Sequence, residues 1–170
     1  MPETQPTATE HEDLIGLPTG KGTVVVERAA VTAFATAVGD DSPVYANAEV
    51  ARAAGFDGIP APPTFGFAIQ HSGRWDELQP PDATPERSPV AELMGGLMAK
   101  GGIVLHGEQT FEYHRPVIVG QRLHFEGVVR DVYRKPAGEA TMTFLVVEDT
   151  YRDDDGNPVL TSTMNLIHRG

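Results

Sequence analysis

At 170 residues the chain is about the length of one ordinary domain, long enough to bury a core without disulfides or metal ions. It carries 13 Lys and Arg against 24 Asp and Glu, and the resulting formal charge of -11 repels nucleic acid and anionic lipid. It has no cysteine, which excludes disulfides, a thiolate nucleophile and a cysteine-based zinc site. No stretch approaches the roughly 20 apolar residues of a membrane span, and the chain does not start like a secretory signal. We therefore expect a cytoplasmic protein with no metal site, no nucleic-acid partner and no membrane span.

The beginning of the chain offers little to bury. Residues 1–13 are rich in Pro, Thr and Glu, which predicts a disordered lead-in to a single domain at 14–170. The β-branched run at 23–27 then predicts a first strand, with Gly20 and Gly22 as the turn residues before it.

Two short helices are expected next. Apolar residues at steps of three and four predict a helix at 28–38, and Gly39 suits the end of that helix because glycine tolerates positive φ. Asn47 is a suitable N-cap for a second helix at 48–54.

The middle of the chain contains the expected central helix. Prolines at 60, 62 and 63 make the stretch before it non-helical, and Thr64 can cap a helix that runs over 64–78. Four prolines predict a surface excursion over 79–89. The apolar patch at 93–98 has two interpretations, a wall of a pocket or subunit contact and a flexible loop packed on the core.

The last third is rich in strands. Loss of alternation near Gly127 predicts a β-bulge there. One strand, then helices, then several strands joined by turns indicate an α+β domain whose antiparallel sheet wraps a central helix. The free edge of such a sheet favours a dimer. The expected strands lie at 103–113, 123–134, 140–151 and 159–168.

One stretch carries a family signature. Residues 34–51 have Gly39-Asp40-Asp41-Ser42-Pro43-Val44-Tyr45 at their centre. This stretch resembles the signature of MaoC-like (R)-specific enoyl-CoA hydratases: an aromatic residue, small residues, Gly-Asp-x-Asn-Pro-aliphatic-His, a spacer and a small residue. Ser42 stands where the family has Asn, and Tyr45 stands where it has His. The positions that fit are Phe34, Gly39, Asp40, Pro43, Val44 and Ala51.

A later segment extends the resemblance. Phe111-Glu112-Tyr113-His114-Arg115-Pro116-Val117, with Gly120, is similar to a strand and turn of the same family, in its dehydratase N-terminal, fatty-acid-synthase-like branch. The resemblance implies a dimeric hotdog fold and a role in fatty acid or lipid metabolism. It also implies an acyl thioester as substrate. Coenzyme A or a carrier protein would be part of that substrate, and no separate cofactor is expected.

The resemblance also implies catalytic positions. Hydration of an enoyl thioester needs a positioned water, a base, an acid, and donors for the thioester oxygen. In the family the Asp and His hold the water, so the matching catalytic positions are Asp40, Tyr45 and Ser42. A phenol with a pKa near ~10 stays protonated at neutral pH, so Tyr45 is a poor replacement for imidazole. An alternative for Asp40 is a turn residue that caps or is solvated.

The matching substrate-binding positions are Pro62, Pro63, Thr64 and Phe65. The resemblance implies a backbone N–H at this point that donates to the thioester oxygen, but proline has no N–H. The N–H groups of Thr64 and Phe65 remain as substitutes at the positive end of the helix.

Three histidines are alternative bases, although each by itself is more typical of a structural or surface histidine. They are His71, His106 and His114.

The sequence thus predicts a subunit of an (R)-specific enoyl-thioester hydratase or 3-hydroxyacyl-thioester dehydratase, a lyase. Because its Asn and His are replaced, we expect it to be weakly active or non-catalytic alone and to form a homodimer or a heterodimer with a catalytic hotdog chain. One alternative is an acyl-thioester binding or assembly module. Another, a hotdog thioesterase, wants a carboxylate early on the central helix, and none occurs over 64–75.

Overall fold

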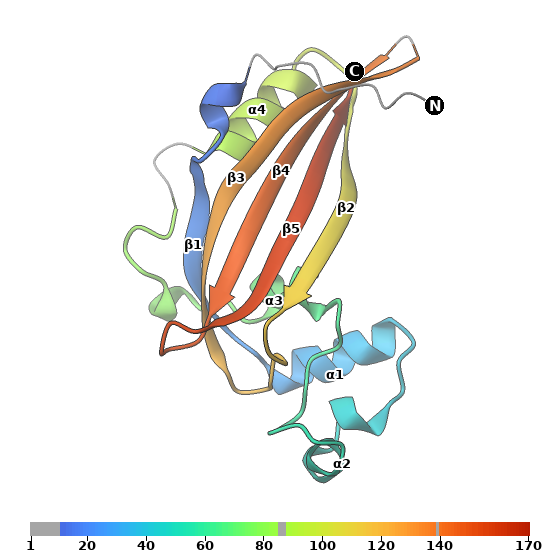
Figure 1. The fold of residues 1–170 in the computed structure, drawn as a ribbon, viewed down its shortest axis with the longest axis vertical. Helices are drawn as coiled ribbons and strands as arrows, with labels where there is room; N and C mark the ends of the chain where they lie inside the picture. The colour runs from blue at the N-terminus through green and yellow to red at the C-terminus, as the bar shows by residue number, and fades with distance from the viewer. Residues whose placement is uncertain (1–10, 85–87, 139) are drawn as a thin grey trace.

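The computed structural model describes residues 11–84, 88–138 and 140–170 (Figure 1). Residues 1–10 of the predicted lead-in lie outside this part, and Glu12–Leu14 forms a 3-10 turn. The described strands form one antiparallel sheet in the order β1-β3-β4-β5-β2. The α+β class is therefore as predicted, and the last four strands lie within three residues of their expected bounds. The strands are β1 (Pro18–Val25), β2 (Ile103–Tyr113), β3 (Arg122–Ala137), β4 (Ala140–Arg152) and β5 (Pro158–Arg169).

Two strand details differ from the sequence prediction. Gly20 and Gly22 lie inside β1, and a Cβ at residue 22 would come within 2.8 Å of the Phe125 ring. Gly22 therefore serves close packing and does not form a turn. The bulge predicted at Gly127 lies in the neighbouring strand: the pairing of β1 with β3 shifts beside this glycine, between Pro18 and Gly20, so the extra residue is in β1 and not in β3. The pairing of β3 with β4 stays regular through this glycine and shifts only between Val129 and Asp131.

The first two helices form as predicted. Helix α1 (Arg28–Ala37) follows β1, and helix α2 (Ala48–Ala53) begins after Asn47. The Asn47 side chain accepts hydrogen bonds from the N–H groups of Glu49 and Val50, which satisfies two free donors at the helix start. Both helices lie beyond one end of the sheet (Figure 1).

The apolar patch at 93–98 belongs to helix α4 (Pro89–Met98). The Ser88 hydroxyl caps it by accepting from the Ala91 N–H, and Leu93, Met94 and Leu97 are buried. In the described part of the chain, no helix is long and apolar enough to cross a membrane.

The predicted helix at 64–78 is wrong in extent. It is broken into η3 (Phe65–Phe67), α3 (Ile69–Ser72) and η4 (Asp76–Leu78). Helix α3 stops because Gly73 contacts β1 directly: the Gly73 carbonyl accepts from the Val25 N–H at 2.8 Å. A Cβ at residue 73 would overlap the Val25 carbonyl oxygen, so this approach requires glycine.

The chain after Gly73 covers the edge of β1. The Gln79 side chain accepts from the Thr23 N–H at 3.0 Å and donates to the Thr23 carbonyl at 2.9 Å, and Lys21 N–H donates to Ala83 O at 3.1 Å. Strand β2 forms the other edge. Among the described residues, no backbone hydrogen bond reaches 103–113 from outside the sheet. One edge is therefore covered and the other is available for pairing.

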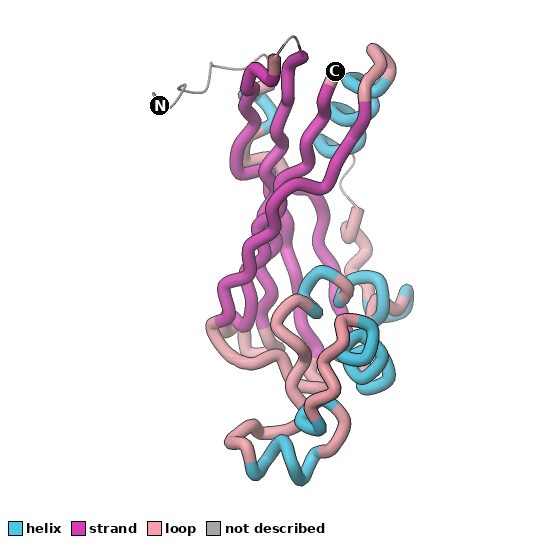
Figure 2. The backbone as a smooth tube through the Cα atoms, turned by 90° about the vertical axis from the view of Figure 1, so that its right-hand side faces the viewer, coloured by secondary structure: helices cyan, strands magenta, loops and turns pink. Residues whose placement is uncertain are grey.

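The core has two parts on the helical face of the sheet (Figure 2). Near α1 and α3 the cluster is centred on Phe65, Ile69, Leu123 and Tyr151. Near α4 it is centred on Leu93, Val129 and Leu145. Because α3 is short, none of the helices in the described residues runs between the two clusters.

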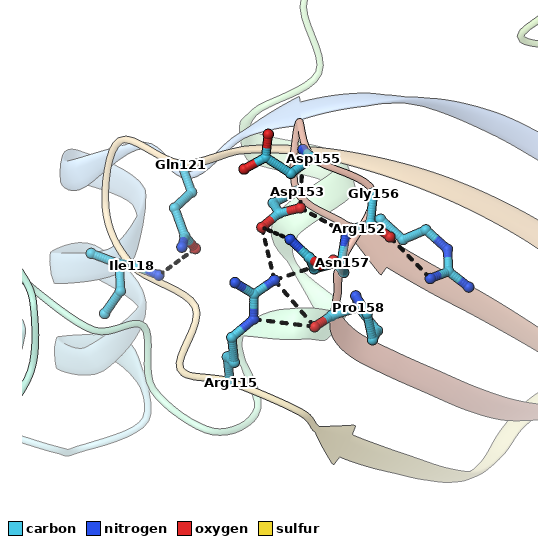
Figure 3. A network of polar contacts seen from close by, with 9 residues as sticks. All are labelled: Arg115, Ile118, Gln121, Arg152, Asp153, Asp155, Gly156, Asn157 and Pro158. Carbon is cyan, nitrogen blue, oxygen red and sulfur yellow. Dashed lines mark hydrogen bonds and ion pairs between the residues drawn. The ribbon is translucent and has the colours of Figure 1, made fainter.

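A polar network fixes the turn between β4 and β5 (Figure 3). Arg115 donates to the Asp153 carboxylate at 2.9 Å and to the carbonyls of Asn157 and Pro158. The hydrogen bond from Arg115 lowers the pKa of Asp153 to about 2. The Arg115 in the family-like segment 111–117 therefore has a structural role.

Helix α3 is joined to the sheet by one glutamine. The amide nitrogen of Gln70 donates to the Asp149 carboxylate at 3.0 Å and to the Tyr151 hydroxyl at 2.7 Å. Burial raises the pKa of Asp149 to about 6; the Gln70 hydrogen bond opposes that shift and the charge of Glu148 adds to it. A half-buried carboxyl thus lies beneath α3.

The raised pKa of Asp149 predicts that stability falls as pH rises from about 4 to about 6. Its folded pKa of about 6 exceeds the unfolded value near ~4, so the native state binds more protons in this interval and loses that advantage as pH rises. The loss is at most about 3 kcal/mol. Urea unfolding at several pH values measures it against Asp149→Asn, which lacks the titrating group. Parallel pH profiles for the two proteins would contradict the prediction.

The close contact of Gly73 predicts that Gly73→Ala destabilises the fold by about 3 kcal/mol, because the new methyl group overlaps the β1 backbone. Gly95→Ala in α4 is the matched control. Its Cβ would meet nothing within 4 Å, and alanine favours a helix interior over glycine by about 1 kcal/mol. Urea unfolding should therefore show opposite signs, and similar midpoints for both variants would exclude the proposed cause of the helix break.

Candidate active site

Asp40 lies on the turn that ends α1. Gly39 has φ of +76°, and the Asp40 N–H donates to Ala35 O at 2.9 Å. The Asp40 Oδ1 accepts from the Ser42 N–H at 3.1 Å. The carboxylate therefore caps its own turn, as the structural alternative for this residue expects, and Ser42 contributes its backbone N–H to that cap.

Tyr45 ends the 3-10 turn η2 (Pro43–Tyr45) beside Asp40. The Thr32 hydroxyl on α1 donates to Tyr45 O at 3.0 Å and holds this turn against the helix. Burial, the charge of Asp40 and a hydrogen bond with Asp40 all raise the pKa of Tyr45. The structure thus brings Asp40 and Tyr45 together, but it moves the phenol further from acting as a base.

The second group of predicted residues begins η3. Pro62 and Phe65 are buried, while Pro63 and Thr64 are exposed. The Phe65 N–H donates to Pro62 O at 2.9 Å and is therefore already used within the turn. Among the described residues, the Thr64 N–H makes no backbone hydrogen bond, so it is the donor still available.

Tyr113 occupies the start of η3. Its hydroxyl donates to Pro63 O, and the backbone N–H of Gly66 donates to it. Burial raises the pKa of Tyr113 to about 12, and the Gly66 hydrogen bond opposes that shift. Tyr113 belongs to the family-like segment 111–117, yet sequence reasoning gave it no role.

Aromatic packing links the turn of Asp40 and Tyr45 to the segment 62–65. The rings of Phe34 on α1 and Phe65 on η3 meet edge to face, 5.5 Å between centroids. In the described part of the chain, no hydrogen bond joins Asp40, Ser42 or Tyr45 to 62–65. The turn with Asp40 and the segment 62–65 are therefore each held by their own hydrogen bonds.

The three alternative histidines lie elsewhere. His71 and His106 flank the exposed Phe67, with ring centroids 6.2 and 5.3 Å from it. The Nε2 of His114 lies 3.1 Å from the Thr161 hydroxyl on β5. In the part of the chain that the structure describes, none of them is hydrogen-bonded to Asp40.

Sequence reasoning also missed Asp149. It lines a cavity of about 320 Å³ together with Gln70 of α3 and Val90 of α4. The only local signal is an acidic residue in a strand opposite a glycine, since Asp149 pairs with Gly127 of β3. Nothing in that pattern reveals that α3 covers the carboxyl.

The chain is similar in sequence to a known domain family and to several proteins. Residues 13–162 match the FAS1-like dehydratase domain region. A UPF0336 protein of Streptomyces avermitilis is 33% identical over 144 residues, which cover 85% of this chain and 84% of that protein. A UPF0336 protein of Clavibacter michiganensis is 34% identical over 146 residues, 86% of each chain.

Solved structures share the fold. The ChsH1-ChsH2 complex from Mycobacterium tuberculosis aligns at 21% identity with a TM-score of 0.70, over 88% of this chain and 83% of that chain. The HadBC (3R-hydroxyacyl-ACP dehydratase) complex of the same organism aligns at 21% identity with a TM-score of 0.63, over 92% and 98%. A MaoC-like dehydratase aligns at 24% identity with a TM-score of 0.66, over 92% and 42%. The sheet and helices thus form the predicted hotdog fold, and the chain belongs to the family of the FAS1-like dehydratase domain region.

Proposed function

We propose that this chain is a weakly active or non-catalytic subunit of an (R)-specific enoyl-thioester hydratase or 3-hydroxyacyl-thioester dehydratase. A second hotdog chain with an intact Asp and His supplies the chemistry, and this chain shapes the pocket for the acyl group. The observation that carries the proposal is Tyr45, which stands beside Asp40 where the family has its histidine.

The chemistry of water addition supports an inactive site. A general base works best when its pKa is near the operating pH. Burial and the neighbouring Asp40 raise the pKa of Tyr45, so the phenol keeps its proton at neutral pH. The Asp40 carboxylate is engaged by the Ser42 N–H. The protonated phenol cannot take a proton from water, and Asp40 has this tyrosine beside it where the family pairs its Asp with His.

Fewer backbone N–H groups are also available to donate to the thioester oxygen. Pro62 and Pro63 have no N–H, and the Phe65 N–H is bonded within its turn. The Tyr113 hydroxyl takes the Gly66 N–H at the same place. Because oxyanion donors typically contribute about 10²–10³ in rate, their loss adds to the missing base.

Two observations support a partner chain. ChsH1-ChsH2 and HadBC are each complexes of two differently named chains, and the latter is described as a 3R-hydroxyacyl-ACP dehydratase. The uncovered edge strand β2 and its surroundings expose large apolar side chains, a feature of binding surfaces. These exposed side chains are Phe67, Ile103, Leu105 and Tyr113.

The alternative, an acyl-thioester binding or assembly module, uses the same surface and pocket without any reaction. It differs in one outcome: its complex with a hotdog partner binds acyl thioesters but shows no more turnover than the partner alone.

The purified chain alone should hydrate crotonyl-CoA at no more than about 1% of the rate of a hotdog hydratase with an intact Asp and His, because general bases contribute about 10²–10⁴. Loss of absorbance of the enoyl thioester measures the rate. Robust turnover that Asp40→Ala abolishes would overturn the proposal of an inactive subunit.

A charge on the free edge should weaken assembly. Leu105→Asp places a carboxylate on the exposed face of β2 and should lower association with a second hotdog chain at least about tenfold. Val38→Asp is the control, since Val38 is also exposed but belongs to the end of α1 and not to β2. Light scattering after size exclusion reports the assembly, and equal effects of both variants would exclude β2 as the interface.

A further inference from the structure

A cavity lies over the sheet between α3 and α4, where α3 stops short. Its volume is about 320 Å³, within the range of about 300–1,000 Å³ that ligand pockets occupy. It separates the two core clusters, because the chain leaves the sheet at Gly73 and follows the β1 edge. We call it the interhelical cavity.

The lining of the interhelical cavity is divided. The side toward α4 is apolar and consists of Val90, Val147, Met164 and Leu166. The side toward α3 and β1 is polar and includes Asp149 together with Thr19, Gln70, Arg74 and Thr84. A lining of this kind matches a ligand with a hydrocarbon body and a polar end, because a polar group taken out of water needs a hydrogen-bond partner.

Asp149 is held in place but keeps capacity to accept a hydrogen bond. Its Oδ2 accepts from Gln70, while its Oδ1 lies with the Thr19 hydroxyl over Gly127, where a Cβ would overlap both atoms. A carboxylate has about four acceptor positions, and Gln70 fills one of them.

No cation neutralises this carboxylate among the described residues. Their ion pairs do not include Asp149, and the guanidinium of Arg74 lies over the Phe125 ring, 5.6 Å from its centroid. The pKa of about 6 is consistent with a carboxyl that is partly removed from water and lacks a positive partner.

We propose that the interhelical cavity binds a hydrocarbon group that carries a hydroxyl, with Asp149 accepting the hydrogen bond from that hydroxyl. The apolar wall from Val90 to Leu166 receives the hydrocarbon, and Gln70 and Gly127 fix the carboxylate. For its physiological setting the inference rests on the proposed function: the ligand is the part of the acyl group remote from the thioester, and its hydroxyl is separate from the reacting carbons.

The test uses 1-decanol and its methyl ether, which share a chain and an oxygen but differ in the ability to donate a hydrogen bond. A hydrogen bond to a charged group is strong. Decanol should therefore bind the wild-type chain at least about tenfold more tightly than its methyl ether at pH 8. NMR titration of the full chain gives both affinities. If the wild-type chain binds both compounds equally, or binds neither, the inference is overturned.

Two variants locate the effect. Asp149→Asn keeps the shape and the contact with Gln70 but removes the charge, so the preference for decanol should fall to about twofold or less. Val90→Trp fills the apolar side and should abolish binding of both compounds. A preference that survives Asp149→Asn would also overturn the inference. Because neither probe is a thioester, a failed decanol test leaves the hydratase proposal standing, and crotonyl-CoA turnover by the chain alone leaves the decanol result standing.

Discussion

The contact of Gly73 with Val25 determines much of this molecule. A backbone-to-backbone approach, possible only without a Cβ, ends α3 after four residues and sends the chain along β1. The edge of β1 is then covered by the segment that contains Gln79. Among the described residues, the edge of β2 is left uncovered, and the sheet between α3 and α4 is left open as a cavity. One steric constraint thus accounts for both the covered edge of β1 and the open space between the two helices.

The candidate active site pairs Asp40 with a tyrosine. Asp40 and Tyr45 are neighbours, as the family signature requires of its Asp and His, and the rings of Phe34 and Phe65 join their loop to η3. Two tyrosines define the site. Tyr45 stands beside Asp40 at the position where the family has its His, and the Tyr113 hydroxyl accepts the Gly66 N–H at η3. Such a site suits a chain that positions a substrate for chemistry done by its partner.

The sequence predicted what depends on local pattern. Alternation and turn residues located the last four strands, and Asn47 located α2, because these signals act within a few residues. The break after Ser72 escaped prediction because the apolar spacing of a helix continues past it, and only the tertiary contact of Gly73 with β1 ends it. Tyr113 and Asp149 were missed for the same reason, since their partners come from distant segments.

The central claim is that catalysis belongs to the partner chain. The most direct measurement is the dehydration rate of a 3-hydroxyacyl thioester by the complex of this chain with a hotdog chain that co-purifies with it, compared between wild type and Asp40→Asn in this chain. We predict rates equal within about twofold, because Asp40 in this chain caps its turn and is paired with Tyr45, where the family has its histidine. A loss of about 10² or more, the size expected for a catalytic acid or base, would contradict it.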